Sequence, residues 1–77
     1  MRISARNQIK GTITELKKGA TTAHVLVDIG DVNTGGPLIM SSITNESVDG
    51  LGLKVGDSVY VIIKESDVMI GVDRSTE

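Results

Sequence analysis

Ser4, Ala5, Arg6 and Asn7 place a hydroxyl, a guanidinium and a side-chain amide within one short segment of the chain. The guanidinium presents five N–H donors in a rigid fork, and the neighbouring hydroxyl adds another donor. Donors of this kind suit a bound oxyanion. The same residue types are also common at turns and at solvated strand starts. The segment is therefore a candidate anion site only if further donors join it.

Further small donors follow near the ends of the predicted strands. Thr44 and Ser47 lie at a predicted helix start, and Lys64 and Ser66 lie at a predicted corner. A helix start also directs free backbone N–H groups and the positive end of its dipole outward. Each of these residues could instead be a simple cap or turn residue. Together with Ser4 and Arg6 they would form a cup that fits a compact, tetrahedral, doubly charged oxyanion.

Five short strands are expected to position these side chains. Alternating or continuous apolar patterns predict strands at residues 9–16, 22–29, 38–43, 59–63 and 68–72. Gly11 is expected to host a bulge in the first strand, and Gly19 to give the following hairpin turn a positive φ. A short helix is expected to begin with Thr44 or Asn45 as its cap and to end at Gly50 and Gly52. Five strands with a helix between the third and fourth predict an all-β, OB-like barrel.

The composition predicts one small domain, residues 1–77, that gains stability by association. Of the 77 residues, 39% are hydrophobic, but Tyr60 is the only aromatic side chain and cysteine is absent. A domain of this size buries only about 60–65% of its unfolded surface. Small folds without disulfides or structural metals are often stabilised by oligomerisation. We therefore expect a homo-oligomer.

Charge and composition disfavour nucleic acids and membranes as partners. The formal net charge is −2 with a pI near 5.2, whereas nucleic-acid binding relies on a basic surface and, for single strands, on aromatic stacking. No secretory leader or apolar run long enough to span a bilayer is visible. These observations predict a cytoplasmic protein.

Catalysis and cation binding are also disfavoured. His24 is the only histidine and alternates with apolar neighbours, which predicts an outward-facing strand residue rather than a general base. Asp31, Asn33 and Gly36 match the first, third and sixth positions of a calcium loop, but Ser42 stands where the twelfth position needs a bidentate Glu. We expect neither an enzyme nor a site for a metal cation or other cofactor.

Several segments resemble the molbindin (Mop) family of molybdate-binding proteins, whose domain also occurs as the TOBE domain of molybdate transporters and regulators. The resemblance rests on residues 3–11, 17–20, 43–48, 51–56 and 61–71, in order and at matching spacing. The opening Ser-Ala-Arg-Asn and the later Lys-x-Ser-x-Val-Met are specific in combination. Nearly the whole chain is covered.

The resemblance implies a hexamer of OB-like domains that binds molybdate or tungstate between subunits for storage or homeostasis. Matched motif by motif, the anion would be held by Ser4, Ala5, Arg6, Lys64, Glu65 and Ser66 of one subunit, with Thr44 and Ser47 of a neighbour closing the site. A second anion position is implied at Lys18, Gly19 and Ala20.

Two departures from the family pattern affect this interpretation. The loop at residues 30–37 is longer than the usual hairpin, and Glu65 replaces a small residue. The Glu65 carboxylate would repel a dianion unless it turned to solvent and left only its backbone N–H in the site. The competing hypothesis is a non-ligating structural or interaction module, in which Ser4 to Asn7 only stabilise an oligomer interface.

Overall fold

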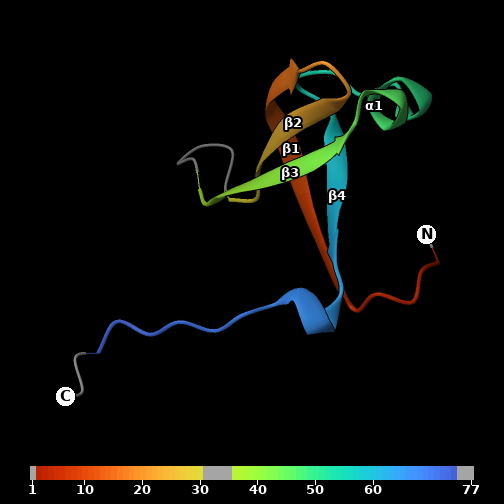
Figure 1. Ribbon diagram of the computed structural model, residues 1–77. Coiled ribbons are helices and arrows are strands. Elements are labelled where there is room, and N and C mark those ends of the chain that lie inside the picture. The colour runs from red at the N-terminus through yellow and green to blue at the C-terminus, as the bar shows by residue number, and fades with distance from the viewer. Residues whose placement is uncertain (1, 31–35, 75–77) are drawn as a thin grey trace.

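The computed structural model describes residues 2–30 and 36–74 of the chain. In this part, the elements follow in the order β1 (Asn7–Lys18), β2 (Thr22–Asp28), β3 (Leu38–Thr44), α1 (Asn45–Leu51), β4 (Ser58–Ile63) and the 3-10 helix η1 (Glu65–Asp67). The strands form one antiparallel sheet in the order β3-β2-β1-β4, which curls into a half-barrel with α1 at one end (Figure 1). Most of the loop at 30–37, including Asp31 and Asn33, lies outside the described residues.

β1 joins the two halves of the sheet. Its first half pairs with β4, from Asn7 opposite Ile63 to Thr12 opposite Ser58. Its second half pairs with β2, and the register shifts between Ile13 and Glu15, so that Thr14 is the extra residue of a bulge. A bulge bends a strand and increases its twist, which lets one strand serve both halves.

The prediction of a bulge at Gly11 is therefore wrong. A Cβ at Gly11 would lie 2.6 Å from Val27 Cγ1 and 2.7 Å from the Asp28 carbonyl oxygen. Gly11 marks a close approach of β1 to β2 rather than an extra residue in the ladder.

The core lies on the concave face of the sheet and is closed by α1. Ile13, Ala23, Val25, Val27 and Val48 are buried, and partly buried aliphatic side chains from β1, β3 and β4 pack against them. The inward-facing alternation predicted for the second strand is confirmed by Ala23, Val25 and Val27. Because these side chains are small, the core is thin.

Caps and turns fix the ends of α1. The Thr44 side chain accepts a 3.0 Å hydrogen bond from the Ser47 N–H, and Gly52 ends the helix in the left-handed conformation with φ 65°. Gly50 lies inside the helix, so its predicted role in ending it is wrong. The hairpin turn at Gly19 is present, with a 2.7 Å bond from Gly19 N–H to the Thr22 carbonyl. The positive φ predicted for Gly19 is absent, because among the described glycines only Gly52 and Gly56 have a positive φ.

The fifth strand predicted at residues 68–72 is not formed in the single chain. After η1 the backbone runs away from the sheet as an extended segment without a partner strand among the described residues (Figure 1). The pattern of residues 68–72 is strand-like, but a strand also needs an edge to pair with, and the corner at η1 directs the segment away from β4. β3 and β4 consequently remain edge strands of an open half-barrel.

Within residues 2–30 and 36–74, no helix has the length and apolar character needed to cross a membrane.

Candidate functional site

The pairing of β1 with β4 brings together the segment before β1 and the segment after β4. Asn7, the first residue of β1, lies opposite Ile63, the last residue of β4. The residues that precede β1 and those that follow β4 therefore leave the sheet side by side. This pairing therefore places Arg6 beside Lys64, although the two residues are far apart in sequence.

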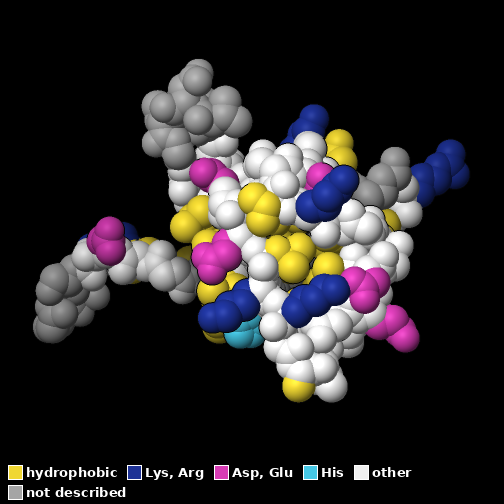
Figure 2. Space-filling model, turned by 90° about the horizontal axis from the view of Figure 1, so that it is seen from above, with side chains coloured by type: hydrophobic (Ala, Val, Ile, Leu, Met, Phe, Trp, Pro, Cys, Tyr) yellow, Lys and Arg dark blue, Asp and Glu magenta, His cyan; other side chains and the backbone are white. Residues whose placement is uncertain are grey.

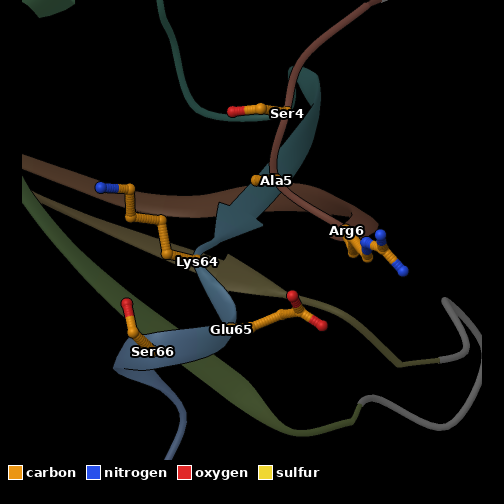
Figure 3. Close-up of a pocket in the computed structure, with 6 residues that line it drawn as sticks. All are labelled: Ser4, Ala5, Arg6, Lys64, Glu65 and Ser66. Atoms are coloured by element: carbon orange, nitrogen blue, oxygen red, sulfur yellow. The ribbon is translucent and has the colours of Figure 1, made fainter.

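The two segments line an open surface pocket of about 290 Å³. Its lining comprises Ser4, Ala5, Arg6, Lys64, Glu65 and Ser66 (Figure 3). All six residues assigned to the main site of one subunit by the resemblance are thus neighbours in the structure. The pocket offers two hydroxyls, two cationic tips and one carboxylate.

Local hydrogen bonds hold the two segments. The Gln8 side-chain amide donates to the Ala5 carbonyl at 2.9 Å, which pins the segment before β1. On the other side, the Asp67 N–H donates to the Lys64 carbonyl at 2.9 Å and closes the η1 corner. The pocket walls are therefore short and locally fixed, while the side-chain tips remain exposed to solvent.

The charges in the pocket are not neutralised by ion pairs. Among the described residues, the only carboxylate within 4 Å of a cationic side chain is Asp49, which pairs with Lys18. Figure 3 shows the side chains of Ser4 and Lys64 extending to one side of the pocket and those of Arg6 and Glu65 to the other. Although Glu65 shares the pocket, neither cation forms an ion pair within 4 Å among the described residues, so both can bind an external anion.

Thr44 and Ser47 do not lie in this pocket within one chain. Thr44 is the partner of Thr22, near the Lys18 end of β1, whereas the pocket lies at the Asn7 end. The twelve residues of β1 correspond to roughly 35 Å of strand at about 3.3 Å per residue. Thr44 Oγ1 also donates to Ser47 Oγ at 2.8 Å. These hydroxyls cannot reach the pocket of their own chain.

The helix start also offers fewer free N–H groups than its sequence predicts. The Ser47 N–H is capped by Thr44, and the Asn45 N–H donates to the Thr21 carbonyl at 2.9 Å. The Asn45 side-chain amide donates to the Gly19 carbonyl at 3.0 Å. The start of α1 is therefore hydrogen-bonded to the β1–β2 turn.

A second open pocket, also of about 290 Å³, lies at that turn. It is lined by Lys17, Lys18, Gly19, Thr22 and His24, so Lys18 and Gly19 contribute as the resemblance implies, whereas Ala20 does not. The sequence did not identify three of these lining residues as site residues, namely Lys17, Thr22 and His24. Lys17 and His24 are register partners on the exposed face of β1 and β2. Lys18 Nζ lies 2.6 Å from Asp49 Oδ1, so its charge already has a partner.

The comparisons with known proteins agree with this fold. The family model described as the TOBE domain matches residues 3–70. Molybdenum-pterin-binding protein 1 of Clostridium pasteurianum is 49% identical over 70 residues, covering 91% of this chain and 97% of that protein. The chain belongs to the molbindin (Mop) family.

Solved molbindin structures share the architecture. MopII from Clostridium pasteurianum aligns with a TM-score of 0.80 at 44% identity, covering 92% of this chain and 100% of that chain. The cytoplasmic molybdate-binding protein ModG, with molybdate bound, aligns with a TM-score of 0.82 at 41% identity, covering 95% of this chain and 49% of ModG. The region that matches the TOBE domain, residues 3–70, includes both segments of the main pocket.

Proposed function

We propose that this molbindin binds molybdate or tungstate as an intact dianion, without catalysis, and serves in cytoplasmic storage or homeostasis of the metal oxide. Residues 1–77 would act as one oxyanion-binding domain. The similarity to ModG, a cytoplasmic molybdate-binding protein, supports this proposal. So does the similarity to molybdenum-pterin-binding protein 1 of Clostridium pasteurianum.

The observation that carries the proposal is the pocket formed by residues 4–6 and 64–66. Arg6 and Lys64 come from opposite ends of the chain, line one surface and have no carboxylate within 4 Å among the described residues. Their hydroxyl neighbours Ser4 and Ser66 add neutral donors. Charge-assisted hydrogen bonds to an ionised acceptor are roughly twice as strong as neutral ones. A tetrahedral dianion beside Lys64 would use both cations once the Arg6 side chain turned from the Glu65 side of the pocket toward Lys64 (Figure 3).

Glu65 contributes its backbone N–H rather than its side chain in this proposal. Its carboxylate extends away from Ser4 and Lys64 (Figure 3). The anion would then lie on the Lys64 side of the pocket, with the carboxylate turned to solvent. This arrangement accommodates the residue that departs from the family pattern.

A neighbouring copy would complete the site with Thr44 and Ser47. Because these hydroxyls lie at the far end of β1, their participation requires a second chain, and the proposed assembly is a homo-oligomer, a hexamer as the family resemblance implies. The thin core and the open half-barrel support association. An anion shared between chains stabilises the assembly by mass action.

The turn at Lys18 and Gly19 is proposed as a weaker second anion position. An anion there would compete with Asp49 for Lys18. We therefore expect it to fill only after the main pocket.

The test is thermal unfolding combined with isothermal titration calorimetry, using molybdate, tungstate and sulfate. We expect both metal oxides to raise the melting temperature and to bind more tightly than the smaller sulfate. A non-ligating interaction module would show neither heat nor a shift with any of the three anions. That result would refute the proposed function.

A further inference from the structure

The second pocket, at the β1–β2 turn, contains two basic side chains that the family resemblance does not assign to it. These are Lys17 and His24, which are register partners on β1 and β2 and are both exposed. Directly opposite residues of an antiparallel pair have Cβ atoms about 4.5–5.5 Å apart, so both side chains can reach one bound anion. Thr22 lies two residues before His24 on the same face and adds a hydroxyl.

The positive charge available to an anion in this pocket comes from Lys17 and His24 rather than from Lys18. Lys18 is already paired with Asp49 of α1 at 2.6 Å. Among the described residues, no carboxylate, including Glu46 of α1, lies within 4 Å of Lys17 or of the His24 ring. Figure 2 shows the histidine side chain beside a cationic side chain on the surface of the molecule. Both basic groups therefore remain available to a ligand.

The proton on the imidazole decides how the pocket meets an anion. A protonated imidazole is positively charged and donates from both ring nitrogens, whereas a neutral one donates from one nitrogen and presents a lone pair on the other. Histidine is the side chain whose charge ordinarily changes between about pH 5 and pH 8. Lysine amines and carboxylates ordinarily keep their charges in that interval. The charge that faces the pocket thus depends on the proton of one residue.

The strands on either side of His24 bring one further charge to its face of the sheet. From β1, Lys17 lies opposite the imidazole, and Glu15 lies diagonally, two residues before Lys17. From β3, the register partner is Ser42, which carries no charge. Glu15 forms no ion pair with either basic group within 4 Å. His24 is also the only histidine of the chain.

We propose that His24 makes the second anion position proton-controlled. A tetrahedral dianion binds between the protonated imidazole and Lys17, and it leaves when the imidazole loses its proton as the pH rises. This inference rests on the proposed function, since it concerns the weaker of its two anion positions, and adds the residues and the condition that govern occupancy. One added unit charge about 5 Å from a dianion in water at physiological salt makes binding roughly three- to tenfold tighter. The protein would hold additional molybdate under mildly acidic conditions and release it under alkaline ones.

The first experiment measures molybdate bound per chain by equilibrium dialysis at about pH 6 and about pH 8.5, on either side of the histidine interval. Molybdate is a dianion at both values, so the charge of the ligand does not change. We expect a tight binding phase from the main pocket at both values. The weaker second phase should be roughly three- to tenfold tighter at the lower pH. A second phase of equal affinity at both values, or no second phase, would overturn the proposal.

The second experiment replaces the imidazole by side chains of fixed charge. His24→Gln remains polar and neutral, so its second phase should be weak at both pH values. His24→Lys carries a permanent charge, so its second phase should be tight at both. The matched control combines His24→Gln with Ser42→Lys, which puts the same charge one strand further from the pocket and should regain little affinity. Thermal unfolding without anion checks that all variants fold.

The two phases separate this inference from the proposed function. Absence of the tight phase from every protein would count against the proposed function. An intact tight phase together with a second phase that remains pH-dependent in His24→Gln would overturn this inference alone, because the proton would then belong to another group. A pH dependence confined to the tight phase would place His24 at the main anion of a neighbouring chain and would also overturn it.

Discussion

The two ends of β1 carry similar side chains in different electrostatic states. At the Lys18 end, the lysine is paired with Asp49 at 2.6 Å, and Thr44 is bonded to Ser47. At the Asn7 end, Arg6 and Lys64 line a pocket and have no carboxylate within 4 Å among the described residues. Donors that already have partners stabilise the fold, whereas donors without internal partners are available to a ligand. In the proposed function, the main anion pocket of each chain therefore lies at the Asn7 end, whereas the partnered donors at the Lys18 end first stabilise the fold.

The largest expected effect is at the end with unpaired charges. Arg6→Ala or Lys64→Ala should each weaken molybdate binding by about 1.5–3 kcal/mol, because each removes a charge-assisted hydrogen bond to the dianion. Isothermal titration calorimetry measures the loss. Lys10→Ala removes the same charge from the exposed face of β1, outside the pocket, and should bind like wild type. Unchanged affinity in both pocket variants would dismiss the site.

At the other end, Thr44 tests structure and binding together. Thr44→Ala should lower the free energy of unfolding by about 1 kcal/mol, because it removes the N-cap acceptor of the Ser47 N–H. Urea denaturation measures this change, and Thr44→Ser should retain most of the stability. If Thr44 also closes the anion site of a neighbouring chain, Thr44→Ala loses molybdate affinity and Thr44→Ser keeps it. Equal stability of all three proteins would contradict the cap.

The carboxylate of Glu65 tests how an acidic side chain in the main pocket affects anion affinity. Glu65→Gln should strengthen molybdate binding by roughly 0.5–1 kcal/mol, because it removes a solvent-screened repulsion of the dianion. Asp67→Asn, at the other end of η1 and outside the pocket lining, is the control with the same loss of charge. Titrations at low and high salt should show the Glu65→Gln gain shrinking as screening increases. Weaker binding by Glu65→Gln would mean that the carboxylate contributes to the site.

The smallest effect is expected at the paired lysine. Lys18 and Asp49 are 44% and 68% exposed, and such surface pairs contribute about 0–1 kcal/mol to stability. Lys18→Ala should therefore change the free energy of unfolding little and leave the affinity of the main pocket intact. It should remove only the weaker second binding phase in the titration. A loss as large as that of Arg6→Ala would erase the distinction between the two ends.

Local patterns in the sequence predicted the strands whose residues alternate regularly. Ala23, Val25 and Val27 point to the core as their period of two indicates, because side-chain direction in a strand is set by the backbone itself. The bulge was misplaced at Gly11, because its position depends on the pairing of β1 with β2, which puts Thr14 out of register. Gly11 is instead required because a Cβ at this position would clash with the Val27 side chain.

Long-range relations could not be deduced from the pattern alone. Residue types identified Ser4, Arg6, Lys64 and Ser66 as donors, but their proximity depends on the Asn7–Ile63 register. From the sequence, only the family resemblance predicted that these four residues belong to one site. The strand expected at residues 68–72 shows the opposite limit, since its apolar pattern is real but its partner edge is not available in its own chain.

The most direct test is a crystal structure of the protein grown with tungstate, whose anomalous scattering locates the anion without ambiguity. The account predicts a peak in the pocket beside Arg6 and Lys64 of one chain, within hydrogen-bond distance of Thr44 and Ser47 of another. An empty pocket in crystals that hold tungstate elsewhere, or a peak at the Lys18 turn alone, would contradict it.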